Sequence, residues 1–230
     1  PVDDVLALVD VPFLVQFHEH LADGEVDHMP EKGHLYHVRY DFEDGSGSVI
    51  IATTRPETIP GDTAVAVNPK DKRFGDLVGK KCLLPVMNRE MPIIADDYVD
   101  TEFGTGAVKI TPAHDPNDYE MGLRQHLDTI VVIGKDGKMT AESGKYAGMD
   151  RYEARKAMVE DLEKLGLLVK VVDHVHNVGT HDRCKTTVEP MIKPQWFVKM
   201  DEMAKAAIDT LKDGDLQFVP ERFDKTYLHW

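Results

Sequence analysis

Residues 102–120, E-F-G-T-G-A-V-K-I-T-P-A-H-D-P-N-D-Y-E, constrain the possible fold more than any other stretch of the chain. They open on a Gly-Thr-Gly turn at residues 104–106, where two glycines permit positive φ angles and a close approach of the backbone to a ligand. Residues 107–111 predict a short strand, which Pro112 ends because proline cannot donate to a ladder. This order predicts a turn, a strand and a sharp stop.

A strong helix start follows at residues 114–118, H-D-P-N-D. Asp115 is the expected N-cap, Pro116 the first helical residue, and Asp118 lies in the first turn near the positive end of the helix dipole. Taken alone, this helix start is explained better by a structural cap than by a functional site. Because the strand and the helix start adjoin, we expect one polar site built from four side chains: Lys109, Thr111, Asp115 and Asp118.

A second polar cluster, A-T-T-R-P-E-T at residues 52–58, follows the apolar run 48–51 that predicts a buried strand. Its hydroxyls and its arginine stand where a strand enters a proline-marked turn, which suits them to hold a phosphate, a ribose or a carbonyl oxygen. A solvated turn is the other interpretation. The two clusters occur in one chain about fifty residues apart, and the pair is more informative than either alone.

Together the two clusters resemble the editing domain inserted into class I aminoacyl-tRNA synthetases for branched aliphatic amino acids. Glu57 followed by G-D-T-A-V-A-V at residues 61–67 is similar to the valyl-type pattern. Isoleucyl-type domains usually carry Trp at the position of Glu57, and leucyl-type domains carry Asp there. Residues 59–60, Ile-Pro, depart toward the isoleucyl pattern. An isoleucyl- or leucyl-type editing domain therefore stays as an alternative.

The resemblance extends over residues 25–230, because the motifs at 146–152, 188–198 and 218–223 also match the valyl pattern. It implies an α+β fold with a β-barrel-like core of short strands and peripheral helices, in keeping with the many short strands that the sequence predicts. We expect an unplaced N-terminal segment at residues 1–24, an editing core at 25–172, and connecting strands and a helix at 173–230 that return toward a catalytic core. We also expect residues 1–22 to form an amphipathic helix broken near Pro12.

The resemblance implies hydrolysis of the ester in threonine mischarged on tRNA(Val), with a positioned water in place of a covalent nucleophile. Asp118 and Asp115 would hold the threonine ammonium and hydroxyl, above a floor of Lys109 and Thr111. His114 is open to two interpretations, a general base and a structural residue. The expected substrate-binding residues are Thr53, Thr54, Arg55, Phe103, Gly104, Thr105, Gly106 and His114. An inert insertion that only positions tRNA remains the alternative from another functional class.

Composition limits the partners. With 27 basic and 41 acidic residues the net charge is −14, which disfavours binding of nucleic acid by bulk electrostatics. The two cysteines give no disulfide framework, and neither a secretory signal nor a membrane anchor is evident, so we expect a cytoplasmic setting. The expected partners are the tRNA(Val) acceptor end, the threonine moiety and the rest of a parent synthetase.

Two further expectations concern chemistry that the sequence does not support. The chain has no His-x-Gly-His or Lys-Met-Ser-Lys-Ser type motif, so we expect no activation of an amino acid and no cofactor. The spacings His174-x-His176 and His181-x-x-Cys184 have a basis in zinc chemistry, but closed zinc sites favour more thiolates than one cysteine supplies. We therefore predict no metal site.

Overall fold

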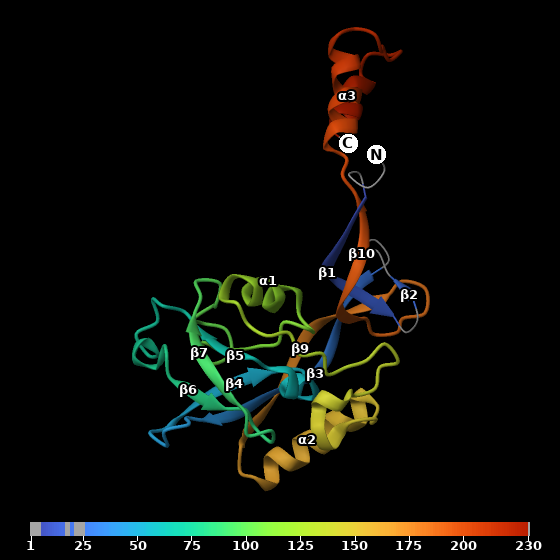
Figure 1. The fold of residues 1–230 in the computed structure, drawn as a ribbon. Coiled ribbons are helices and arrows are strands. Elements are labelled where there is room, and N and C mark those ends of the chain that lie inside the picture. The colour runs from blue at the N-terminus through green and yellow to red at the C-terminus, as the bar shows by residue number, and fades with distance from the viewer. Residues whose placement is uncertain (1–5, 17–18, 21–25, 230) are drawn as a thin grey trace. The chain divides into compact units, whose positions relative to one another are not determined.

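The structure, a computed structural model, describes residues 6–16, 19–20 and 26–229 (Figure 1). The chain divides into two compact units, one of Pro12–Ile192 and one of Pro1–Val11 with Lys193–Trp230. All twelve residues predicted for the site lie in the Pro12–Ile192 unit, and the following paragraphs treat that unit first.

The first sheet of this unit has the strand order β4-β3-β9. β3 (Val26–Asp41) pairs antiparallel with β4 (Ser48–Thr53) and, over a long ladder, with β9 (Leu168–His181). The expected hairpin between the first two strands is confirmed, because the Phe42 amide donates to the Gly47 carbonyl at 2.9 Å. The end of β4 delivers Thr53 and Thr54 to the site.

The second sheet has the order β6-β7-β5-β8. β5 (Ala64–Val67) runs parallel to β7 (Glu90–Ala95) and antiparallel to β8 (Ala107–Ile110), and β6 (Lys81–Leu83) forms an edge. Successive side chains of a strand point to opposite faces. Ala64 and Ala66 accordingly pack in a small apolar cluster with Met121, whereas Val65 and Val67 pack in the main core. Strand β5 is therefore buried on both faces.

Two helices cover the sheets (Figure 1). α1 (Pro116–Gln125) places Met121 against the faces of β5 and β8. α2 (Arg151–Lys164) buries Ala154, Met158 and Leu162 completely in the main core, as their helical spacing predicts. The same spacing predicts that Leu165 is buried, which is wrong, because Leu165 lies at the C-cap and is 57% exposed. Three short 3-10 helices, η3 (Pro56–Gly61), η4 (Gly75–Leu77) and η5 (Ala141–Tyr146), occupy the connections.

A third sheet has the order β10-β1-β2, formed by β10 (Glu189–Val198), β1 (Leu6–Gln16) and β2 (Glu19–His20). The predicted helix over residues 1–22 is therefore wrong where the structure describes it. Valines at 9, 11 and 15 explain the difference, because β-branched side chains lose rotamer freedom in a helix and favour strands. After β10 come α3 (Asp201–Lys212) and α4 (Phe223–His229), of which α3 was predicted and α4 was not.

The predicted α+β class is confirmed, but the described strands form three separate sheets and do not close into a barrel. A barrel needs a continuous ladder around its wall, whereas the β4-β3-β9 and β6-β7-β5-β8 sheets are joined by apolar packing in one shared core. Residues 129–138 predict a hairpin with a turn at 135–138, and the structure has a short one whose strand pairing is limited to the bridge between Ile133 and Met139. The domain limits at residues 24/25 and 172/173 stay predictions. Over its described length, the chain has no helix with the length and apolarity needed to span a membrane.

Candidate functional site

The predicted site residues converge on a cavity of about 270 Å³, here called the polar cavity. It lies where the ends of β4 and β8 meet the start of α1. Nine of the twelve predicted residues line it: Thr53, Thr54, Arg55, Phe103, Lys109, Thr111, His114, Asp115 and Asp118. Residues about fifty positions apart in the sequence thus share one space, as predicted.

Lys109 and Thr111 form a polar floor that is satisfied from within the protein. The Lys109 ammonium contacts Thr58 Oγ1 and Asp62 Oδ1, each at 2.9 Å, and also Thr111 Oγ1. Thr111 Oγ1 donates to Asp62 Oδ1 at 2.6 Å. An ammonium has three protons, so every Lys109 donor has a partner in this arrangement.

Asp115 and Asp118 stand side by side at the start of α1. Asp115 Oδ1 accepts from the backbone amides of Asn117 at 2.8 Å and Asp118 at 3.2 Å, which confirms the predicted N-cap. Asp118 Oδ2 accepts from the Thr111 amide at 2.8 Å. Burial, with repulsion from Asp115 in second place, raises the pKa of Asp118 to about 7, although Lys109 opposes the shift. Asp118 therefore changes charge near neutral pH.

His114 is fixed inside the fold. Its Nε2 accepts from the backbone amides of Val132 at 2.9 Å and Ile133 at 3.3 Å, and its side chain is buried. Burial lowers the pKa of His114 to about 3, and the nearby charges of Arg55 and Lys109 act in the same direction. A neutral imidazole whose Nε2 already accepts two amides is poorly placed to take a proton from water, so this geometry favours the structural interpretation.

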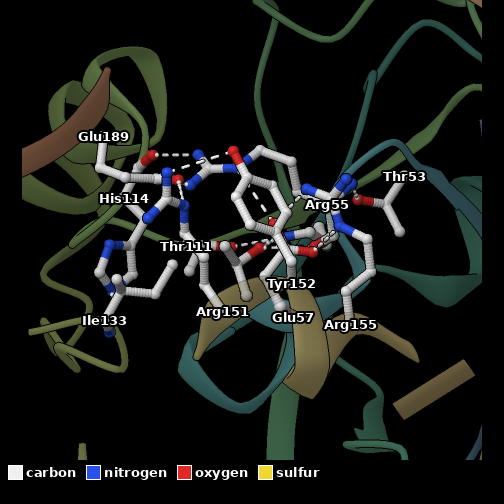
Figure 2. Close-up of polar contacts among 12 residues, drawn as sticks. Thr53, Arg55, Glu57, Thr111, His114, Ile133, Arg151, Tyr152, Arg155 and Glu189 are labelled. Atoms are coloured by element: carbon white, nitrogen blue, oxygen red, sulfur yellow. Dashed lines mark hydrogen bonds and ion pairs between the residues drawn. The ribbon is translucent and has the colours of Figure 1, made fainter. Parts of the chain in front are cut away.

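Arg55 is surrounded by protein partners (Figure 2). Its Nη1 donates to the His114 carbonyl at 3.0 Å, its Nη2 to Glu189 Oε2, and its Nε lies 3.7 Å from Glu57 Oε1. Glu57 is completely buried and is held by a bidentate pair with Arg155 at 2.6 and 2.7 Å. The arginine thus ties the exit of β4 to β10 and to η3.

A second cavity of about 320 Å³, here called the apolar cavity, adjoins the first, since Phe103, Asp115 and Asp118 line both. Gly104 and Thr105 lie on its wall, together with Val99, Val108 and Met121. Gly106 lines neither cavity. Its φ is +79°, and a Cβ there would lie 2.4 Å from Arg73 Nη2, so Gly106 shapes the turn and has no contact with either space.

The histidine motifs form no metal centre within the part of the chain that the structure describes, because no three or more possible ligands gather there. The rings of His174 and His176 stack with centroids 5.9 Å apart, and His181 Nδ1 lies 3.2 Å from Cys184 Sγ. Each pair is too small to complete a tetrahedral site.

The sequence argument missed the residues that hold Lys109. Asp62 and Thr58 contact Lys109 directly, and Tyr40 acts through Asp62. Thr58 lines the polar cavity whereas Asp62 and Tyr40 do not, and none of the three was predicted as a site residue. A signal existed, because Asp62 is the charged residue of a stretch that is otherwise almost wholly apolar from residue 59 to 67. A charge placed there has to be paired once the stretch is buried.

Comparison with known proteins identifies two groups of relatives. The family model "Leucyl-tRNA synthetase, editing domain" matches residues 69–163. Valine–tRNA ligases from Clostridium tetani, Geobacillus stearothermophilus and Bacillus subtilis are 60%, 56% and 54% identical to the chain over 91% of its length. The matched region is 24% of each relative's length, so the chain spans about a quarter of these ligases.

One solved structure shares the fold at low sequence identity. It is a ternary complex of LeuRS, tRNA and LeuAMS from Agrobacterium radiobacter K84, with a TM-score of 0.50 and 18% identity. The match covers 70% of this chain and 21% of that one. It supports the architecture described above.

Proposed function

Because the chain belongs to the editing-domain family of aminoacyl-tRNA synthetases, in the branch found in valine–tRNA ligases, we propose that it hydrolyses the ester that joins threonine to tRNA(Val). A site shaped for valine discriminates poorly against threonine, a limit for which valine–tRNA ligase is itself the standard illustration. A second site that removes the wrong product corrects such errors. On this proposal the chain acts with the rest of its synthetase in the cytoplasm.

The observation that carries the proposal is the meeting of Asp115, Asp118, Lys109 and Thr111 on one cavity of about 270 Å³. An ester of threonine brings an ammonium, a hydroxyl and a polarised carbonyl. The ionised carboxylate of Asp118 suits the ammonium, and the remaining lone pairs of Thr111 Oγ1 and Asp115 are free to accept from the hydroxyl. Valine would leave these acceptors unpaired at a cost of about 1–3 kcal/mol.

We assign the nucleoside end of the substrate to the neighbouring spaces. The apolar cavity, with Phe103, Val99 and Val108 in its wall, suits the adenine ring. A larger cavity of about 690 Å³ shares Thr54, Arg55 and Asp115 with the polar cavity and gives the polynucleotide a path to it. Because Arg55 is already held by Glu189 and the His114 carbonyl, its proposed role is to shape the entrance, with contact to the ester as the lesser part.

Hydrolysis in this site uses a positioned water. An ester is already activated, so orientation of the water and of the carbonyl, with the fixed charge of Lys109 near the developing oxyanion, supplies the main assistance. Asp118 in its ionised form binds the substrate ammonium and holds the carbonyl carbon in place. His114 supports the wall from within.

The test compares hydrolysis of Thr-tRNA(Val) with that of Val-tRNA(Val) by the chain, by Asp118→Ala and by Asp128→Ala, a matched control at an exposed carboxylate outside the cavities. We expect selective loss of the threonyl ester, reduced about 100-fold or more in kcat/KM by Asp118→Ala and unchanged by the control. Equal hydrolysis by wild type and Asp118→Ala would contradict the proposal. Tight tRNA binding without any hydrolysis would favour the positioning insertion.

A further inference from the structure

A buried carboxylate under the polar cavity has no part in the function proposed above. Asp62 is completely buried, directly follows η3 and precedes β5. It is absent from the lining of the polar cavity, so it cannot touch the substrate there. Any influence of Asp62 on hydrolysis has to pass through the residues that it holds.

Each oxygen of Asp62 has a defined partner. Oδ1 lies 2.9 Å from the Lys109 ammonium and accepts from Thr111 Oγ1 at 2.6 Å. Oδ2 accepts from the Tyr40 hydroxyl at 2.8 Å, and Tyr40 is also completely buried. Tyr40 belongs to β3, Asp62 to the connection between η3 and β5, and Lys109 to β8. Three elements of the core therefore fix the direction of this carboxylate.

The consequence falls on two residues of the cavity floor. A lysine ammonium on a flexible stem adopts many positions unless its donors are occupied. Asp62 and Thr58 draw the ammonium to the protein side. By accepting the proton of Thr111, Asp62 also leaves the other lone pair of that hydroxyl to face the cavity.

The same pairing keeps Lys109 away from the carboxylates above it. Among the described residues, the ion pairs of Lys109 include Asp62 and neither Asp115 nor Asp118. If Asp62 lost its charge, the buried ammonium would be left unpaired, and the nearest way to satisfy it would be to turn toward Asp118. Lys109 would then form an ion pair with Asp118, the carboxylate proposed to bind the substrate ammonium.

We propose that Asp62, oriented by Tyr40, is a positioning residue of the hydrolytic site that aims Lys109 and Thr111 and reserves Asp118 for the substrate. The inference rests on the proposed function. It assigns the buried pair a role in the turnover rate, in addition to its place in the core.

The test uses Asp62→Asn and Tyr40→Phe in the 230-residue chain. The chain offers a matched control, because Asp161 accepts from the Tyr146 hydroxyl at 2.7 Å and pairs with Lys145 at 2.8 Å, with no part in the polar cavity. Asp161→Asn and Tyr146→Phe thus make the same substitutions in the same kind of trio. Circular dichroism and thermal melting are used to test whether each of the four variants is folded.

We expect Asp62→Asn to lower kcat for Thr-tRNA(Val) by about 10- to 100-fold, and Tyr40→Phe by about 3- to 10-fold, with KM changed by less than about 3-fold. The controls should stay within about 2-fold of wild type. The midpoint of the pH profile should also move to lower pH in Asp62→Asn, because Asp62 raises the pKa of Asp118 and Lys109 lowers it. Asp115 and Thr111, which also face Asp118, are unchanged in these variants. The lost charge of Asp62 contributes to this shift by itself, so the deciding kinetic readout is the fall in kcat at unchanged KM.

A second readout separates this inference from the proposed function. In nitrogen-detected NMR spectra the Lys109 ammonium should exchange its protons slowly in wild type and quickly in both variants, whether or not the chain hydrolyses an ester. If both variants fold, keep kcat within about 2-fold and keep the slow exchange, the inference is overturned. If Asp62→Asn does not fold, Tyr40→Phe decides by the same two readouts. If the wild-type chain hydrolyses neither ester, that result counts against the proposed function. The NMR comparison of the Lys109 ammonium would still test the inference.

Discussion

At the scale of single residues, the two carboxylates at the start of α1, Asp115 and Asp118, make different contacts. Asp115 uses one oxygen for the backbone of the helix, whereas Asp118 uses one for the Thr111 amide and is otherwise turned to the cavity. Burial raises the pKa of Asp118 to about 7, and the neighbouring charge of Asp115 is the second cause. Asp118 is therefore half ionised near neutral pH, and its ionised form is the one proposed to bind the substrate ammonium.

This difference predicts the pH dependence. Hydrolysis by the wild type, corrected for spontaneous loss of the ester, should rise with pH through about 7 as Asp118 loses its proton. Asp115→Asn keeps a good N-cap but removes the repelling charge, so the midpoint should fall by about 0.5–1 pH units. The profile is measured as kcat/KM between pH 5 and pH 9, with Asp128→Asn as the matched control. A midpoint that stays in place or rises would contradict the assignment.

The sequence predicted which residues gather at the cavity, because its two motifs end at strand exits that the fold brings together. The sequence did not predict which partners the side chains at the cavity hydrogen-bond to. Arg55 and Lys109 looked free to bind a ligand, and in the structure their donors are occupied by protein partners. Glu189 is 134 residues from Arg55 and Asp62 is 47 residues from Lys109, so no local pattern reveals these pairings, although both acids lie in stretches that the resemblance covers.

At the scale of elements, residues 131–133 depend on a side chain from another segment. This stretch was predicted as a hairpin strand, yet it forms only the bridge from Ile133 to Met139. The amides of Val132 and Ile133 donate to His114 Nε2 in place of a neighbouring strand. Local alternation of apolar residues cannot reveal such a partner, because the acceptor is a side chain eighteen residues away.

The first consequence is a stability prediction. His114→Ala leaves two buried amides without an acceptor and opens a cavity, so the free energy of unfolding should fall by about 2–4 kcal/mol. Urea unfolding followed by circular dichroism measures the change. His34→Ala is the control, since His34 is 53% exposed and pairs with an exposed Asp173, and it should change stability by less than about 0.5 kcal/mol. Full stability with complete loss of hydrolysis would instead indicate a general base.

At the scale of the whole molecule, the net charge of −14 bears on the proposed binding of tRNA. Each phosphate contact contributes about 0.7–0.9 to the slope of log K against log salt. A chain with this charge should make few such contacts, so we expect weak binding of tRNA(Val) with a slope shallower than about −2. Fluorescence anisotropy between 50 and 300 mM salt measures it. A slope of about −5 or steeper would favour a tRNA-positioning module.

The fold class was accessible from the sequence and the arrangement of the sheets was not. Short strands and amphipathic helices were readable from local periodicity, as in α2, where three of the four apolar residues predicted on one face are buried and Leu165, at the end of the helix, is exposed. The long ladder of β3 with β9 joins residues 26–38 to residues 168–181. Pairing at that separation is decided by the whole core, and no short motif encodes it.

The adjacency of β1 and β10 in one sheet has a consequence for the history of the chain. A module whose incoming and outgoing strands pair with each other needs only a single loop of a host protein as its attachment point. Such a module can be gained, lost or exchanged without disturbing the host's own connectivity. On the function proposed above, ester hydrolysis is then an activity that a ligase gains or loses with one insertion.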